Sequence, residues 1–123
     1  VPGLEPNRGS VVGRLDAFGG RVVLTADAPR EIEAYLVATH HDALAGDVLK
    51  AGHHGSKTST AEPFIAAVKP AYAVISAGAD NRYSHPHPEV VHRLKKAGAE
   101  VLETHYGTIV FRYERGEWKK VSP

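Results

Sequence analysis

Four of the eight histidines of this chain lie in two short stretches. His53 and His54 stand side by side in DVLKAGHHGSKTS, and His85 and His87 alternate with prolines in SHPHP. Neighbouring residues on a strand point to opposite faces, so His53 and His54 cannot both point into the core. At least one of them is expected to face a cleft or solvent. The chain has no cysteine, so a metal ion would be held by imidazole and carboxylate, which suit zinc, manganese or iron.

Each candidate follows a segment with the pattern of a strand. Asp27 comes after RVVLT, His53 and His54 come after DVLKA, and His85 and His87 lie in the loop after AYAVIS. In open α/β sheets, sites form beyond the carboxyl ends of the strands. The three strand ends are therefore expected to bring a carboxylate and several imidazoles to one rim, which would suit a divalent metal.

The same residues also have purely structural interpretations. Asp27 immediately precedes a predicted helix and can cap it, which does not exclude metal binding by the same carboxylate. A pair of histidines is also a common feature of surface loops, and the prolines of SHPHP can simply stiffen an extended loop. The remaining candidates are interpreted as solvated side chains: His40, His41, His92, Lys57, Arg82, Arg93, Lys95 and Lys96, of which Lys57 and Arg82 share the loops of the rim.

The elements that must position this rim alternate between strands and helices. Apolar alternation predicts a hairpin of residues 10–18 and 21–25 that turns at Gly19-Gly20, and further strands at 47–51, 71–76, 100–103, 107–113 and 118–121. Helical spacing predicts helices at 29–38 and 88–97, and one ended by Lys69-Pro70 that Ser59 and Glu62 open as a capping box. This order predicts an α/β layered domain.

Length and composition restrict the class of protein. The chain has 123 residues and a formal net charge of +1, which fits one globular domain without a global field for nucleic acid or anionic membranes. No apolar stretch approaches the roughly 20 residues that a bilayer span needs. The chain contains no methionine and begins Val1-Pro2-Gly3, so we expect it to be a segment of a longer protein.

Several stretches, taken in order, resemble a known family. They are residues 7–10, 24–27 with Glu31 and Glu33 just beyond, 47–56, 75–76 with 81–86, 103–104 and 107–109. Together they resemble the metallo-β-lactamase-like domain of ComEC-type DNA-internalisation proteins, the membrane channels of natural transformation. The resemblance extends from about Asn7 to Phe111, and DVLK…HHGS and Asn…His-Pro are its most specific blocks.

The resemblance implies an αββα sandwich, a mixed sheet with helices packed on it, and a metal site at the sheet edge. Asp27 resembles the carboxylate that bridges two metal ions, and His53 resembles a later imidazole ligand. His54 is a further metal candidate, or it orients its neighbour or the substrate. His85 resembles a histidine that donates a hydrogen bond near the scissile phosphate, so Asp27 and His85 are the candidate catalytic residues. Candidates for supporting the ligands or contacting substrate are Ser56, Lys57, Asn81 and Arg82.

Two departures from the family pattern affect this interpretation. The usual Thr-Gly-Asp is Thr-Ala-Asp here, with Ala26 in place of glycine, and no His-x-His-x-Asp-His motif occurs. Residues 1–123 therefore resemble only the C-terminal half of the domain. Asp27 and His53 are two ligands, whereas a site generally needs three or four from protein. The segment alone is expected to bind metal weakly or not at all and to be inactive.

In the intact parent, the resemblance implies hydrolysis of DNA assisted by zinc or manganese. The segment would be a soluble domain of a bacterial inner-membrane channel. Two other interpretations remain open: a non-catalytic or degenerate module that supports the channel or its partner contacts, and a hydrolase of this fold with another substrate. Half of a two-sheet fold leaves an apolar sheet face uncovered, so we also expect the isolated segment to form a homodimer.

Overall fold

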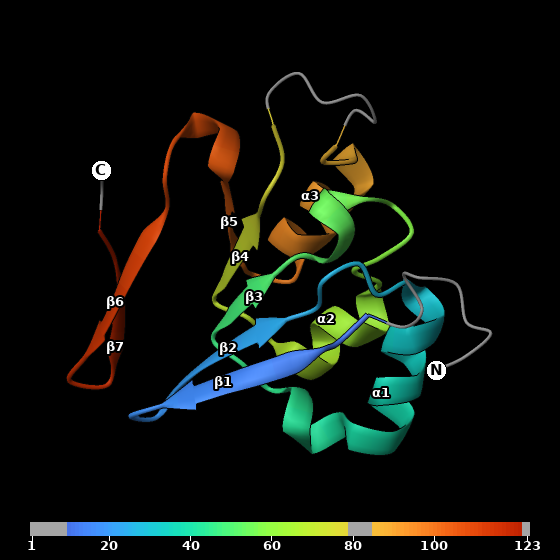
Figure 1. Ribbon diagram of the computed structural model, residues 1–123, viewed down its shortest axis with the longest axis horizontal. Coiled ribbons are helices and arrows are strands. Elements are labelled where there is room, and N and C mark those ends of the chain that lie inside the picture. The colour runs from blue at the N-terminus through green and yellow to red at the C-terminus, as the bar shows by residue number, and fades with distance from the viewer. Residues whose placement is uncertain (1–9, 79–84, 122–123) are drawn as a thin grey trace.

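The computed structural model describes residues 10–78 and 85–121, and its main feature in these ranges is a five-stranded sheet (Figure 1). The strand order is β1-β2-β3-β4-β5; β1 pairs antiparallel with β2, and β2 to β5 run parallel. A separate antiparallel hairpin consists of β6 and β7. The strands are β1 Gly13–Ala17, β2 Gly20–Leu24, β3 Val48–Lys50, β4 Tyr72–Ile75, β5 Glu100–Glu103, β6 Val110–Glu114 and β7 Glu117–Val121.

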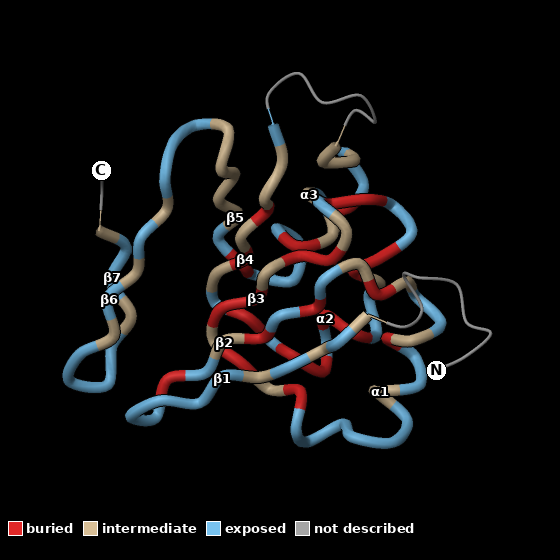
Figure 2. The backbone as a smooth tube through the Cα atoms, viewed as in Figure 1, coloured by how far each residue is buried: buried red, intermediate tan, exposed pale blue. Residues whose placement is uncertain are grey.

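The helices of the described chain pack on one face of the main sheet. They are α1 Arg30–His40, α2 Glu62–Val68 and α3 Pro88–Lys96, and short 3-10 helices occupy His41–Leu44, Gly52–Gly55 and Thr104–Tyr106. Val23, Leu49 and Ala73 pair in register across the parallel strands, so their side chains share the face under the helices. Figure 2 shows the buried backbone gathered in the inner strands and α2. The core cluster combines Val23, Leu49, Ala73 and Ile75 with Phe64, Val68, Val90 and Leu94.

The β6–β7 hairpin packs on the opposite face, where the parallel strands begin. The ring of Phe111 lies 5.0 Å from the ring of Tyr72, measured between centroids. The indole Nε1 of Trp118 donates a 3.0 Å hydrogen bond to Oδ2 of Asp47, just before β3. Trp118 also lies directly over Gly20 at the start of β2. The hairpin is thereby fixed at the end of the sheet that lies away from the strands' carboxyl ends.

Part of this second face remains uncovered. Leu15 and Leu24 point away from the helices, and they are 60% and 43% exposed. Each belongs to the β1–β2 hairpin, where β1 is an edge strand of the sheet. The structure thus contains exposed apolar side chains on the face for which the sequence predicts a missing partner layer.

The predicted order of strands and helices is confirmed, as is the α/β class with a mixed sheet. Several boundaries differ, and three of these differences concern the turn, the loop and the strand described next. The first turn is formed by Phe18 and Gly19, both with positive φ, because a two-residue hairpin turn needs that conformation and Gly20 is used for contact with Trp118. The first helix continues to His40 and is followed by a 3-10 helix where the sequence predicts a loop, and β6 begins only at Val110. No helix in the described ranges is long and apolar enough to cross a membrane.

Replacing Gly20 with alanine should destabilise the protein by about 1–3 kcal/mol, the usual cost of overpacking. The added Cβ would lie 2.9 Å from Cζ2 of Trp118 and 3.0 Å from Cγ of Tyr113. Gly13 is the matched control, because a Cβ there would meet nothing within 4 Å. Urea unfolding should show a loss for Gly20→Ala and none for Gly13→Ala. Equal effects would contradict the packing of the hairpin on Gly20.

Candidate functional site

The carboxyl ends of the parallel strands bring most of the predicted site residues to one edge of the sheet. Asp27 follows β2, the 3-10 helix that contains His53 and His54 follows β3, and Ser76 follows β4. His85 precedes α3, and its ring lies beside that of His53. The remaining candidates, Asn81 and Arg82, lie outside the described residues.

Hydrogen bonds join the turn that carries Asp27 to the loop that carries the histidine pair. They run from the His53 amide to the Ala26 carbonyl (2.8 Å), from Ser59 Oγ to the Ala28 carbonyl (2.7 Å) and from the Arg30 amide to the Thr58 carbonyl (2.9 Å). Because Ala26 immediately precedes Asp27, the first of these bonds makes the backbones of Asp27 and His53 near neighbours. These contacts therefore hold the backbone segments of Asp27 and His53 next to each other at this edge.

Three imidazoles form a cluster at this edge. The ring centroid of His53 lies 5.8 Å from that of His85 and 6.4 Å from that of His54. Burial lowers the pKa of His85, and the neighbouring His53, His54 and His87 lower it further. A lowered pKa favours the neutral ring, which has one nitrogen that donates and one that accepts.

His54 and His53 are oriented by different partners. Nδ1 of the exposed His54 donates a 2.6 Å hydrogen bond to the carbonyl of Ser76, so in the neutral ring the other nitrogen is left as an acceptor. Metal-ligating histidines commonly have this arrangement, which makes His54 as good a candidate on geometry as its neighbour. Nδ1 of His53 lies 3.4 Å from the hydroxyl of Thr58, which in turn contacts Oγ of the buried Ser56 at 2.9 Å.

Ser56 therefore supports His53 through Thr58, a residue that sequence reasoning missed although it belongs to the hydroxyl-rich stretch after the histidines. Lys57, between them, is exposed. The Ser56 hydroxyl also stabilises the loop locally, because its Oγ accepts a 3.3 Å hydrogen bond from the Thr58 amide.

Backbone strain is concentrated in the segments that form this edge. Ala26, His53, His54 and Thr60 have φ values of 48°, 48°, 54° and 59°, in the left-handed region that costs a non-glycine residue about 1–2 kcal/mol. The other described non-glycine residues with positive φ end a helix or form hairpin turns: Lys69, Phe18 and Arg115. Such strain persists only where surrounding contacts hold it, and it is typical of functional sites.

The glycine after the histidine pair permits close contact with the segment that carries His85. Gly55 has a φ of 80°, and a Cβ there would lie 2.6 Å from Cβ of Pro86. Its carbonyl accepts a 2.9 Å hydrogen bond from the amide of His87. A larger residue at position 55 would push the two histidine segments apart.

Both predicted helix caps are wrong. Asp27 does not cap α1, because Pro29 is the N-cap residue and no side chain caps that helix. Ser59 and Glu62 form no capping box, because the N-cap of α2 is Ala61 and the Ser59 hydroxyl is used to reach Ala28 instead. The Asp27 carboxylate is thus not engaged as a helix cap.

Glu33 of α1, rather than a capping box, binds two backbone amides at the start of α2. Its carboxylate accepts the amides of Thr60 at 2.6 Å and Ala61 at 2.9 Å, and the residue is only 1% exposed. Burial raises the pKa of Glu33, while the two amides and the nearby Arg30 and Arg93 oppose that rise.

Arg93, interpreted from the sequence as solvated, is another correction. Its side chain is 13% exposed, and its Nη1 donates to the carbonyl of Thr60 at 2.7 Å. The sequence offers no local signal for this contact, since position 93 looks like one more basic residue of an amphipathic helix.

The described residues do not form a complete metal site. Within residues 10–78 and 85–121, no three histidine or carboxylate side chains lie close enough together to hold one ion. Structural and catalytic zinc sites use three or four protein ligands. The edge therefore combines three clustered imidazoles with the segment that carries Asp27, which is less than a full cage.

No family model matches the chain. Among curated proteins, the chain is 43% identical over 109 residues to ComE operon protein 3 of Bacillus subtilis and 38% identical over 114 residues to Competence protein ComA of Neisseria gonorrhoeae. It is 39% identical over 98 residues to Recombination protein 2 of Haemophilus influenzae. The chain is related to competence proteins. The matches cover 88%, 92% and 80% of the chain, but only 14%, 16% and 12% of those proteins.

Replacing Ala26 with glycine should stabilise the protein by about 0.5–1 kcal/mol. Relief of the left-handed strain, about 1–2 kcal/mol, exceeds the added freedom of the unfolded chain, about 0.5–1 kcal/mol. Ala34, exposed in α1, is the control, and Ala34→Gly should lose about 0.5–1 kcal/mol. Chemical unfolding measures both variants. A loss at position 26 as large as that at position 34 would show that Ala26 is not strained.

Proposed function

We propose that this chain is part of a DNA-uptake protein. In the intact parent, the edge at the carboxyl ends of the parallel strands, which carries Asp27, is proposed to take part in metal-dependent hydrolysis of DNA. The relationship to competence proteins supports the biological setting. The observation that carries the chemistry is the 2.8 Å hydrogen bond from the His53 amide to the Ala26 carbonyl, which makes Asp27 and His53 neighbours at the carboxyl edge of the sheet. Carboxylate and imidazole side chains carried by neighbouring segments can both serve as ligands for zinc or manganese.

The metal site is proposed as a shared one. The described residues do not fit a complete cage, so further ligands would come from parts of the parent beyond them. In that arrangement Asp27 and His53, with His54 as a further candidate, contribute to metal binding, and Ser56 supports His53 through Thr58. Because no cage is complete, we assign no reaction step to the metal.

His85 is proposed to contact the substrate. Its lowered pKa favours the neutral ring near neutral pH, and a neutral imidazole can still donate one hydrogen bond. A donor beside the His53 ring would suit a phosphate oxygen of DNA. Lys57 is exposed on the loop that follows the His53–His54 pair and is proposed to contribute positive charge at this edge.

A second candidate function is a non-catalytic module of the same uptake protein. The incomplete ligand set in the described residues favours this role for the chain on its own. The two candidates predict different behaviour once the rest of the domain is present. We propose that this chain is the C-terminal half of an αββα sandwich in an inner-membrane channel. The chain alone can therefore be compared with the complete sandwich.

DNA cleavage with added manganese or zinc tests the proposal. The 123-residue chain should not cleave DNA, whereas the same protein extended by about 150 residues toward its amino terminus, roughly one further domain, should do so. Asp27→Ala in the extended protein should reduce the cleavage rate by at least about a thousandfold, and chelation of the metal should abolish cleavage.

Asp42→Ala is the matched control, because its carboxylate is fully exposed on the 3-10 helix after α1. This variant should retain the wild-type rate. An extended protein without metal-dependent cleavage would favour the non-catalytic module, and unchanged cleavage in Asp27→Ala would remove Asp27 from the site.

The proposed partner of the isolated chain is a second copy that covers the uncovered sheet face. Sedimentation equilibrium should show a dimer that Leu15→Lys converts to a monomer, because Leu15 is 60% exposed on an edge strand of that face. Tyr35→Lys is the control, since Tyr35 is 61% exposed on α1 instead. A folded wild-type monomer at high concentration would refute the dimer.

A further inference from the structure

We propose that Glu33 and Arg93 are positioning residues. The two side chains form hydrogen bonds to the N–H and the carbonyl of one peptide group, and they thereby hold the segments of Asp27, His53 and His85 in a single arrangement. The group is the peptide that joins Thr60 to Ala61. Neither Glu33 nor Arg93 belongs to the candidate site itself. Their effect on DNA chemistry rests on the proposed function, whereas the arrangement they hold can be tested without it.

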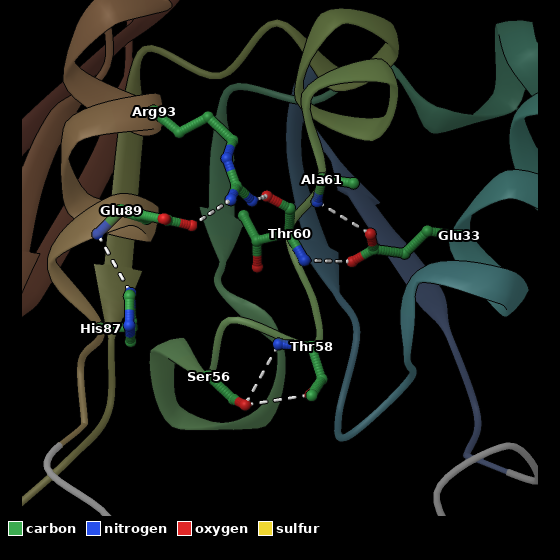
Figure 3. A network of polar contacts seen from close by, with 8 residues as sticks. All are labelled: Glu33, Ser56, Thr58, Thr60, Ala61, His87, Glu89 and Arg93. Carbon is green, nitrogen blue, oxygen red and sulfur yellow. Dashed lines mark hydrogen bonds and ion pairs between the residues drawn. The ribbon is translucent and has the colours of Figure 1, made fainter.

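Both polar groups of this peptide bind a charged side chain, as Figure 3 shows. Its N–H, from Ala61, donates to Oε1 of Glu33 at 2.9 Å, and its carbonyl, from Thr60, accepts from Nη1 of Arg93 at 2.7 Å. The second carboxylate oxygen of Glu33 accepts the Thr60 amide at 2.6 Å. The peptide group thus lies between a carboxylate and a guanidinium, with each end of its dipole facing the complementary charge.

The bridge joins the three segments that carry the site. Glu33 belongs to α1, which begins three residues after Asp27, and Arg93 belongs to α3, which begins three residues after His85. Between them, Thr60 ends the loop that starts with the histidine pair. The hydroxyl of Thr60 also accepts the amide of Gly52 at 3.2 Å, which ties the end of the loop to its beginning.

Burial makes these contacts strong. Glu33 and Thr60 are each 1% exposed, and charge-assisted hydrogen bonds gain strength where water is excluded. Arg93 has a second partner in Glu89, at 3.6 Å, which keeps the guanidinium directed toward the loop. Removing the Glu33 carboxylate would leave two buried amides without acceptors, which is more costly than never having formed the bonds.

The strained conformation of Thr60 explains why a bridge is needed at this point. Its φ of 59° lies in the left-handed region, and such a conformation persists only where the surroundings enforce it. The contacts from α1 and α3 supply that enforcement. Without them, the loop would be free to relax, and His53 would move relative to both Asp27 and His85.

NMR on the 123-residue chain tests the arrangement directly. In Glu33→Gln, an NH2 group that cannot accept a backbone N–H replaces one carboxylate oxygen, so hydrogen exchange of at least one of the Thr60 and Ala61 amides should accelerate by about tenfold or more. The ring signals of His53 and His85 should shift, and the nuclear Overhauser contact expected from their 5.8 Å centroid separation should weaken. Arg93→Gln should produce the same changes and provides the test if Glu33→Gln does not fold.

Two controls separate positioning from stability. Glu31→Gln changes an exposed carboxylate in the first turn of the same helix and should leave the ring signals unchanged. Gly20→Ala destabilises the far end of the sheet and should also leave them unchanged, although it lowers the stability of the whole domain. Unchanged histidine signals in Glu33→Gln and Arg93→Gln, or equal changes in Gly20→Ala, would overturn the inference.

Activity of the extended parent distinguishes the two proposals. If that protein cleaves DNA, Arg93→Gln should lower kcat more than it alters KM, because it displaces the site without removing a substrate contact. A wild-type parent without cleavage, combined with the predicted NMR changes, would contradict the proposed function and leave the bridge intact. Cleavage that Arg93→Gln leaves unaltered, with unchanged histidine signals, would contradict the bridge alone.

Discussion

The hydrogen bond from the His53 amide to the Ala26 carbonyl is the contact on which the candidate site depends. It joins the end of β2 to the end of β3 immediately beyond the sheet, where parallel strands deliver their following residues to the same edge. Asp27 and His53 are consequently neighbours for topological reasons. The helices packed on one face and the β6–β7 hairpin on the other hold the strands that keep this edge in place.

The edge combines strain with polar contacts that offset it. Ala26, His53, His54 and Thr60 adopt left-handed conformations, and each lies in a segment bound by hydrogen bonds from at least one other segment. These hydrogen bonds offset both the backbone strain and the unfavourable burial of polar groups. This arrangement favours one backbone conformation over the relaxed alternatives, which is what a site that must keep its side chains in fixed positions requires.

The strands and helices were largely predictable because their signals are local. The alternation in β1 and β2, the Gly19-containing turn between them and the Lys69-Pro70 stop after α2 each report their own conformation. Glu33 and Arg93 could not be predicted, since both meet Thr60 only through tertiary contacts that no spacing encodes. The capping box failed for the same reason, because Ser59 found a partner in a distant turn. The convergence of Asp27 with the histidines followed from strand order, and their roles in chemistry stay a prediction.

Paramagnetic broadening by Mn²⁺ in the extended parent protein tests the central claim most directly. If Asp27 and His53 share an ion, substoichiometric Mn²⁺ should first broaden the signals of these two residues and of His54 and His85 around them. Signals of the β6–β7 hairpin, at the far end of the sheet, should stay sharp. Broadening that spares Asp27 and His53, or that affects the hairpin equally, would contradict a metal site at the carboxyl edge.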